Sequence, residues 1–349
     1  MNELKFGMMG AGFWAPYQLA GWQEISGVTC VAICDPDLEK ASRVAALRGI
    51  PKAYSSPQEM LSMENIDFLD IVTPVETHSD LVNLAISRNI PVICQKPMAV
   101  YLKEAETLTN RCKSSGTPFF VHENWRWQGQ LRAVKSVLEE GVIGDPFRAR
   151  IDMISGFPVF ANQPFFRELK QFILMDLGSH ILDLARFYFG EASSVYCQTS
   201  RVHRDMKGED VATVMLKMQN VTVLCELAYA ENPLERECFP ETLLFIEGDR
   251  GSIEISPDCW LKVTTSSGTV SRQILPPIYA WADPAYAVAQ TSVVACSRNI
   301  LKGIHGGNSE MTGEDNLETV RLVFAAYESA NSGEVVYLPP KSDPLNLLT

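Results

Sequence analysis

A glycine loop that directly follows the first apolar run of the chain constrains the fold more than any other feature. Residues 10–15 read GAGFWA, which fits the pattern G-x-G-x-x-G/A in its alanine form. The loop lies between an apolar run, expected as a buried strand over Leu4–Met9, and a helix expected over Phe13–Glu24. Strand, glycine turn and helix in this order are typical of a unit that binds a dinucleotide.

Each residue type in and after this loop suits such a ligand. Gly10 permits the tight turn, and Gly12 lets the backbone approach a pyrophosphate without a Cβ in the way. Phe13 and Trp14 lead into the new helix, whose free N–H groups favour phosphate. Asp35 ends the second expected strand, where a carboxylate can accept hydrogen bonds from ribose hydroxyls. Because that carboxylate repels the 2′-phosphate of NADP, we expect NAD as the cofactor. The alternative is an ordinary glycine turn.

Strands and helices alternate through the first 124 residues. Further strands are expected at Val28–Cys34, Phe68–Val72, Pro91–Gln95 and Phe119–His122, and helices at Asp37–Arg48, Glu76–Arg88 and Leu102–Ser115. Strict alternation with short links predicts a doubly wound, parallel Rossmann sheet over residues 1–124.

After Gly144 the chain becomes rich in strands that follow one another directly. They are expected at Phe147–Ile154, Ala192–His203, Ala212–Met218, Thr222–Tyr229, Thr242–Glu247 and Gly251–Ile255, with helices at Gln128–Glu140, Asp176–Phe189, Pro284–Lys302 and Glu314–Ser332. Consecutive strands pair antiparallel through hairpins. The fold class is therefore α/β: the Rossmann domain is followed over residues 125–349 by an α+β domain with a large, mostly antiparallel open sheet. The last helix is expected to pack back toward the first domain.

An apolar sheet face without a cover rarely stays exposed to water. The open sheet therefore predicts a homodimer or homotetramer formed through the second domain.

A lysine stands at the carboxyl end of an expected strand, in the sequence Gln95-Lys96-Pro97. Ligands of doubly wound sheets bind beyond that edge. A lysine shielded there by cofactor and substrate can exchange a proton with a hydroxyl group. The alternative is a surface lysine in a turn.

A second candidate for proton transfer lies in the segment MDLGSHILD, which begins at Met175. Asp176 and His180 are four residues apart and Asp183 follows, so all three share one face of the expected helix. A carboxylate one turn away can orient an imidazole and raise its basicity. The alternative is a helix N-cap aspartate with a hydrogen-bonded core histidine.

Weaker candidates come from residue type and position alone. Thr73 and Pro74 end a strand beside the expected cofactor, and His78 could face the nicotinamide ribose or only hold the turn. Aromatic and polar side chains suited to a sugar, or alternatively to packing between domains, occur as Asn124, Arg126 and Trp127. Phe166, Tyr279 and Trp281 could line the same pocket.

Charge and composition exclude several classes of function. The net charge of −12 argues against nucleic-acid and membrane partners. We expect no signal sequence, and no apolar run of about 18 residues is present. The nine cysteines form no Cys-x-x-Cys pair, and no histidine pair has metal-binding spacing. We therefore expect a cytoplasmic enzyme without a metal.

The glycine loop, Asp35, Thr-Pro-x-x-x-His, the Lys-Pro turn and Asp-x-Gly-x-His-x-x-Asp occur here together with the late segment Thr312-Gly313-Glu314-Asp315. In this order and spacing they resemble the Gfo/Idh/MocA family of oxidoreductases over essentially the whole chain. The resemblance implies hydride exchange between NAD and a sugar or polyol, with Lys96, Asp176 and His180 as catalytic residues. It departs at Gln95, where the family has glutamate; an amide can still bind the nicotinamide ribose.

Both Lys96 and His180 remain candidates for the base that takes the hydroxyl proton. The alternatives to a sugar dehydrogenase are an inositol dehydrogenase, an NAD-dependent glycosidase that oxidises its substrate transiently, and a dinucleotide-binding regulator without catalysis.

Overall fold

The computed structural model describes residues 3–230 and 239–339, and the chain forms two compact units. Unit 1 comprises residues 1–127 and 276–320, and unit 2 comprises 128–275 and 321–349. Residues 276–320, which the sequence division placed in the second domain, group with unit 1 because helix α9 (Ala287–Ile304) packs on α1 (Ala15–Gln23). The last helix, α10 (Gly313–Ser332), is divided between the units after residue 320.

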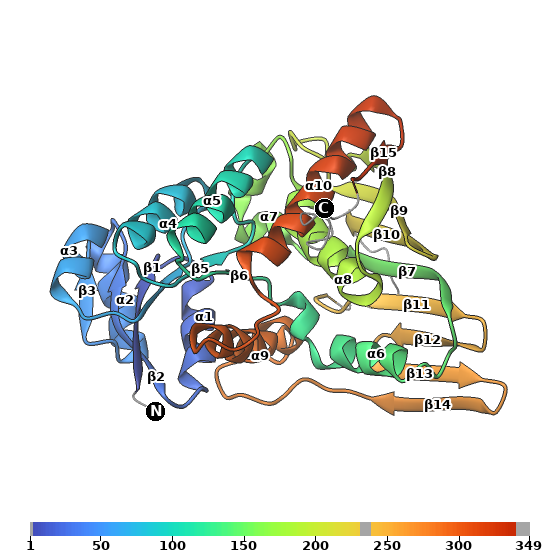
Figure 1. Ribbon diagram of the computed structural model, residues 1–349, viewed down its shortest axis with the longest axis horizontal. Helices are drawn as coiled ribbons and strands as arrows, with labels where there is room; N and C mark the ends of the chain where they lie inside the picture. The colour runs from blue at the N-terminus through green and yellow to red at the C-terminus, as the bar shows by residue number, and fades with distance from the viewer. Residues whose placement is uncertain (1–2, 231–238, 340–349) are drawn as a thin grey trace, which may run out of the picture. The chain divides into compact units, whose positions relative to one another are not determined.

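Unit 1 is built on a parallel sheet of six strands in the order β3-β2-β1-β4-β5-β6 (Figure 1). All its pairings are parallel, which confirms the doubly wound sheet. The strands are β1 (Leu4–Met9), β2 (Val28–Cys34), β3 (Lys52–Tyr54), β4 (Phe68–Ile71), β5 (Val92–Gln95) and β6 (Phe119–His122).

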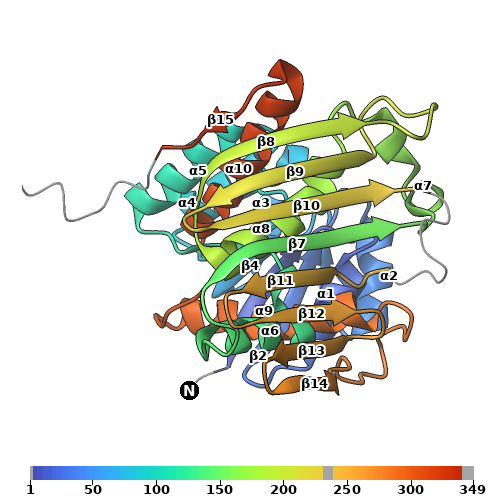
Figure 2. The ribbon, with the colours of Figure 1, turned by 90° about the vertical axis from the view of Figure 1, so that its right-hand side faces the viewer.

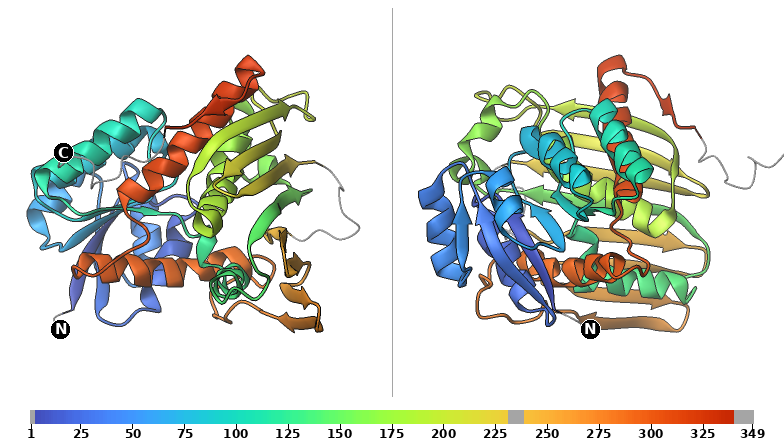
Figure 3. Two further views of the ribbon diagram at one scale, coloured as in Figure 1. Left: turned by 45° about the vertical axis from the view of Figure 1, so that its right-hand side comes forward. Right: turned by 60° about the vertical axis from the view of Figure 1, so that its left-hand side comes forward.

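Helices cover this sheet on both faces (Figure 3). Besides α1 and α9 they are α2 (Leu38–Arg48), α3 (Pro57–Met63), α4 (His78–Ser87) and α5 (Leu102–Ser115). The sequence analysis missed β3 and α3, because runs of three and seven residues are too short to show a period. Their ends nevertheless follow local rules: the Ser56 hydroxyl accepts a hydrogen bond from the Glu59 N–H at the start of α3.

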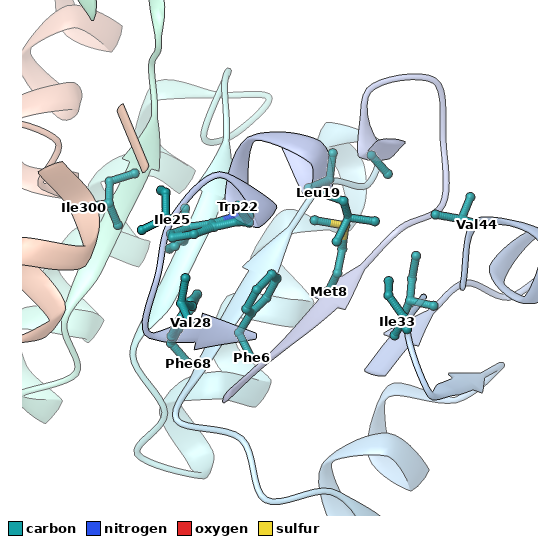
Figure 4. Packing of buried hydrophobic residues seen from close by; sticks show 14 of the residues in the cluster. Phe6, Met8, Leu19, Trp22, Ile25, Val28, Ile33, Val44, Phe68 and Ile300 are labelled. Atoms are coloured by element: carbon teal, nitrogen blue, oxygen red, sulfur yellow. The ribbon is translucent and has the colours of Figure 1, made fainter. Parts of the chain in front are cut away.

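Aromatic packing fixes α1 on the sheet (Figure 4). Phe6 of β1 and Phe68 of β4 stack with ring centroids 5.0 Å apart, and Trp22 of α1 lies 5.3 Å from the first ring and 5.4 Å from the second. All three side chains are fully buried, and Ile300 of α9 belongs to the same cluster. Burying an aromatic side chain contributes about 2–3 kcal/mol, so this cluster holds the helix that begins at the glycine loop.

Unit 2 carries a sheet of nine strands in the order β14-β13-β12-β11-β7-β10-β9-β8-β15, seen face-on in Figure 2. The pairing of β7 with β10 is parallel and the other pairings are antiparallel, which confirms the mostly antiparallel sheet. The strands are β7 (Pro146–Ser155), β8 (Ala192–Ser200), β9 (Val211–Met218), β10 (Val221–Tyr229), β11 (Leu243–Gly248), β12 (Gly251–Ser256), β13 (Trp260–Thr265), β14 (Gly268–Gln273) and β15 (Val336–Tyr337).

Helices of unit 2 pack on one face of this sheet. α8 (Ser179–Phe189) contacts β7 and β10, and α6 (Gly129–Glu139) contacts β13. The segment between β7 and α8 contains three short helical turns, α7 (Val159–Asn162), η3 (Pro164–Glu168) and η4 (Leu174–Gly178). The sequence analysis missed the hairpin of β13 and β14, whose second strand is exposed along its whole length and so shows no apolar alternation.

Candidate active site

The glycine loop has the geometry that its sequence predicts. Gly10 has a φ of +98°, and a Cβ on it would lie 2.4 Å from the carbonyl oxygen of Val72. A side chain at this position is therefore excluded. A Cβ on Gly12 would meet no described atom within 4 Å, so the space above the backbone is open to a ligand. Phe13 is largely exposed, and no described side chain caps the helix that begins after Trp14. A helix that begins directly after a glycine loop is a favourable position for a phosphate group.

Asp35 stands beside this loop. Its Oδ2 accepts a hydrogen bond from the backbone N–H of Ala11 over 2.9 Å, and its Oδ1 accepts one from the N–H of Asp37 over 3.0 Å. The carboxylate is thereby held at the carboxyl end of β2 next to the glycine turn. This is the position in which a carboxylate receives the ribose hydroxyls of a dinucleotide.

His78 joins the two loops that follow β4 and β5. Its Nε2 lies 2.9 Å from the carbonyl oxygen of Thr73, which precedes Pro74, and its Nδ1 lies 3.2 Å from that of Pro97. Burial lowers the pKa of His78, and its hydrogen bonds to backbone groups offset part of that shift. The ring therefore has backbone partners on both sides, as expected of a residue that holds the turn.

Lys96 follows β5 on the same edge of the sheet and is half-buried. Its backbone N–H donates a hydrogen bond over 3.1 Å to Oε1 of the preceding Gln95, and its peptide bond to Pro97 is cis. Gln95 in turn donates from Nε2 to Gln18 Oε1 over 2.5 Å. The Gln95 amide is thus directed into the protein by this contact with α1.

The sequence analysis missed the carboxylate at the end of this contact chain. Asp70 of β4 is fully buried and accepts hydrogen bonds from Gln18 Nε2 and Trp22 Nε1. A charged residue in the apolar run FLDIV was the signal that could have revealed it, because a charge inside a buried strand requires partners.

Asp176 and His180 lie in unit 2 where η4 passes into α8. The expected α-helix over Asp176–Phe189 is correct from Ser179 onward, but residues 174–178 form a π-helical turn. Such turns have a wider backbone ring and are frequent at functional sites. Four residues in either geometry span close to one turn, so the carboxylate and the imidazole still share one face. His180 is buried and Asp176 half-buried.

The surroundings of Asp176 are aromatic. Tyr229 of β10 donates a hydrogen bond from its hydroxyl to Asp176 Oδ2 over 3.3 Å. Its ring stacks on Phe172 with centroids 5.7 Å apart, and Phe166 lies 4.8 Å from Phe172. Burial raises the pKa of Tyr229 well above its usual range, so this phenol remains a hydrogen-bond donor. Asp183, the third residue of the predicted face, lies 3.9 Å from Arg186.

Other predicted substrate residues have partners within unit 1. Asn124 donates from Nδ2 to Ser292 Oγ over 2.7 Å, and Arg126 forms an ion pair with Asp315 at 3.1 Å. Trp127 Nε1 donates to the sulfur of Met311 over 3.2 Å. These contacts join parts of one unit and are not packing between two units. Trp281, likewise, donates to Glu24 and stacks on Tyr279.

In residues 3–230 and 239–339, no group of three or more His, Cys, Asp or Glu side chains could hold a metal ion. No helix of this described part is both long and apolar enough to cross a membrane. Eight of the nine cysteines are free thiols, all buried except the half-buried Cys30; Cys238 lies outside the described residues.

A six-stranded parallel sheet, a glycine loop open to a ligand and an aspartate after the second strand define a dinucleotide-dependent oxidoreductase. The chain belongs to the Gfo/Idh/MocA family: residues 4–123 match its model "Oxidoreductase family, NAD-binding Rossmann fold", and residues 131–254 match that of its C-terminal domain.

Similar proteins cover nearly the full length of the chain. D-apiose dehydrogenase of Rhizobium rhizogenes is 40% identical over 96% of this chain and 98% of its own length. D-apiose dehydrogenase of Paraburkholderia graminis is 39% identical over 97% of this chain and 90% of its own. The crystal structure of an oxidoreductase from Agrobacterium radiobacter in complex with NAD⁺, L-tartaric acid and magnesium has a TM-score of 0.94 at 40% identity, covering 96% and 98% of the two chains.

Proposed function

We propose that this enzyme is an NAD-dependent dehydrogenase that oxidises a small sugar, with D-apiose oxidised at its anomeric carbon to a lactone as the first candidate. The observation that carries the proposal is the shared sheet edge of unit 1. The glycine loop follows β1, Thr73 follows β4 and Lys96 follows β5, and these three strands are neighbours in the sheet. Parallel strands of a doubly wound sheet present their ligands at this edge.

The choice of sugar rests on the relatives. Both D-apiose dehydrogenases are 39–40% identical to this protein over nearly the whole chain. The stretches GAGFWAPYQLAGW, CQKPMA and ENWRWQ carry this resemblance most clearly in the sequence.

The residues of unit 1 fit an NAD molecule. Gly10 permits the tight turn, Gly12 leaves room for the pyrophosphate at the start of α1, and Asp35 has a carboxylate for the ribose hydroxyls. Phe13, Trp14, Thr73, Pro74, His78, Gln95 and Lys96 complete the proposed cofactor-binding set. When bound, NAD supplies the acceptor for the hydride.

Proton transfer is assigned to Lys96, Asp176 and His180. A hydroxyl group must lose its proton as hydride leaves the same carbon, and a lysine or an imidazole can take that proton. We propose that Asp176 orients His180 and that either His180 or Lys96 is the base. Asn124, Arg126, Trp127 and Phe166 are proposed to bind substrate together with the catalytic groups.

The two parts of the chain are proposed to have different roles. We assign cofactor binding to residues 1–124, and substrate binding and oligomerisation to residues 125–349.

The sheet of unit 2 has a face suited to assembly. Outward positions of its neighbouring strands combine apolar side chains, such as Met215, Leu224 and Phe245, with the ion pair of Arg150 and Asp152. A homodimer or homotetramer that covers this face, located in the cytoplasm, is proposed.

The first experiment is an activity screen. Purified protein is incubated with NAD and a panel of aldoses, inositols and glycosides that includes D-apiose, and NADH is followed by its absorbance. The proposal predicts NADH formation with D-apiose or a closely related free sugar. A signal with inositols alone would reassign the substrate class. A protein that binds NADH, as measured by fluorescence, but forms no NADH with any compound would contradict the assignment as a dehydrogenase. That result would favour the glycosidase or the regulator.

A further inference from the structure

Asp70 is a carboxylate in the centre of the unit 1 sheet, on β4 between β1 and β5. It has no exposed surface. Gln18 Nε2 donates to both of its oxygens, over 2.8 and 2.9 Å, and Trp22 Nε1 donates to Oδ2 over 2.8 Å. No Lys, Arg or His of the described residues is among its partners. Burying a carboxylate without a cation costs free energy, and the hydrogen bonds from Gln18 and Trp22 are what offsets this cost here.

Two amide side chains connect Asp70 to the turn that carries Lys96. Gln95 Nε2 donates to Gln18 Oε1 over 2.5 Å, and Gln95 Oε1 accepts from the backbone N–H of Lys96 over 3.1 Å. Gln18 is fully buried and Gln95 nearly so. An amide donates from one side and accepts on the other, so this chain has one direction. The ionised carboxylate, which only accepts, sets that direction.

We propose that Asp70 is a positioning residue for Lys96: it orients Gln18 and through it the Gln95 amide, whose oxygen holds the Lys96 N–H. The inference rests on the proposed function in so far as Lys96 takes part in proton transfer. An amide at position 70 would keep its oxygen as the acceptor for Trp22 Nε1 at the Oδ2 position. Its NH₂ group would then stand at the Oδ1 position, against the NH₂ group of Gln18. If the Gln18 amide rotates to relieve this contact, its NH₂ group faces the Gln95 amide, which must rotate as well. The Gln95 NH₂ group then faces the Lys96 N–H, so that two donors meet.

The ionisation of Asp70 falls within a testable pH range. Burial raises its pKa to about 6, and the hydrogen bonds from Gln18 and Trp22 offset part of the shift. The titratable groups that face it are the thiols of Cys30 from β2 and Cys94 from β5; burial raises the pKa of both, so they stay neutral. A proton on Asp70 turns an acceptor into a donor and weakens the chain as the pH falls through about 6.

A double-mutant cycle tests the direction of the chain. Asp70→Asn replaces one of the two acceptors of Gln18 Nε2 with an NH₂ donor. Gln95→Glu places acceptors on both sides of Gln18, whose amide can donate toward only one of them. In the double variant the chain is complete but reversed: the new amide at 70 donates to Gln18 Oε1, Gln18 Nε2 donates to the new carboxylate at 95, and that carboxylate accepts from the Lys96 N–H.

The expected result is a rescue. Each single variant should lower kcat about tenfold at pH 7.5, and the double variant should return to within about threefold of wild type. Asp67→Asn, the same substitution at an exposed position just before β4, serves as the matched control and should leave kcat unchanged. If kcat of the double variant falls by the product of the two single-variant losses, the two side chains act independently and the inference is overturned.

A second measurement does not depend on turnover or on stable variants. In protein labelled with ¹⁵N-lysine, the Lys96 amide signal, identified by its loss in Lys96→Arg, should shift with a midpoint near pH 6. Asp70→Asn should abolish this titration and Asp67→Asn should retain it. If the Lys96 amide signal titrates but the protein oxidises no sugar, the proposed function is contradicted and the inference about Asp70 is not. A Lys96 amide signal that has the same position in the wild-type protein and in Asp70→Asn at pH 7.5 would overturn the inference, whatever the activity.

Discussion

The backbone N–H of Ala11 donates a hydrogen bond to Oδ2 of Asp35, over 2.9 Å. One carboxylate thereby stabilises the glycine turn and remains at the edge where a ribose would bind.

Asp35→Ser should weaken NADH binding roughly tenfold or more, because a hydrogen bond to a charged group contributes about 1.5–3 kcal/mol. NADPH binding should suffer less, since the repulsion of its 2′-phosphate is lost. Fluorescence titration with both dinucleotides measures this, with exposed Glu39→Ser on the next helix as the control for charge; equal losses for both dinucleotides would contradict the assignment.

Lys96→Ala and His180→Ala should each lower kcat by about 10²–10⁴-fold, the usual contribution of a positioned acid or base. NADH should still bind to both variants, because the glycine loop and Asp35 are unchanged. Steady-state kinetics with the sugar found in the screen, together with NADH fluorescence, gives both quantities. Normal turnover in either variant removes that residue from the mechanism, and the variant that flattens the pH profile of kcat identifies the base.

Tyr229→Phe removes the hydroxyl that hydrogen-bonds Asp176 and leaves the ring stacked on Phe172. The expected loss of about 1 kcal/mol corresponds to a decrease in kcat of roughly fivefold. The melting temperature should change little, because the substitution opens no cavity. Kinetics and thermal melting of the same preparation test this. A large loss of stability with unchanged kcat would instead make Tyr229 a packing residue.

His122, the last residue of β6, makes stability depend on pH. Burial lowers its pKa from 6.5 to about 4. Since the folded-state pKa is the lower one, the neutral ring contributes stability that is fully present above pH 6.5 and is lost as the pH falls toward 4. At about 1.4 kcal/mol per pKa unit the loss reaches roughly 3 kcal/mol.

Urea denaturation between pH 7.5 and 4.5 measures this loss. The wild-type protein should be destabilised more steeply by acid than His122→Gln, whose amide does not titrate. His305→Gln, at an exposed histidine in the same unit, should behave as wild type. Parallel pH profiles for wild type and His122→Gln would show that the buried ring is not the cause.

Phe245 is directly opposite Arg150 in the sheet of unit 2 and is 39% exposed. If this face forms the proposed oligomer, Phe245→Glu should shift the protein toward the monomer, because a carboxylate there would be buried at the interface. Size-exclusion chromatography with light scattering measures the mass. Val202→Glu, on an exposed loop, should leave the assembly intact, and an unchanged mass in Phe245→Glu would place the interface elsewhere.

The sequence predicts those features whose physical requirements lie within a few consecutive residues. Gly10 must adopt a positive φ, Gly12 must lack a side chain, and Asp35 must end the strand that follows, so local order sufficed to identify the cofactor loop. The face shared by Asp176 and His180 was likewise visible from a spacing of four residues. Spacing could not reveal the π-helical turn before α8, since its backbone geometry preserves nearly the same face.

Tertiary structure alone decided which distant residues meet. Gln18 and Asp70 are 52 positions apart and Gln18 and Gln95 are 77 apart, yet they form one buried chain of hydrogen bonds. The placement of α9 on α1 was equally beyond prediction from the sequence. An apolar period shows that a helix or strand has a buried face, whereas the partner of that face depends on how all the elements pack together. For the same reason, the sequence shows Asp70 only as a charge in an apolar strand, and its hydrogen bonds exist only once α1 packs on the sheet.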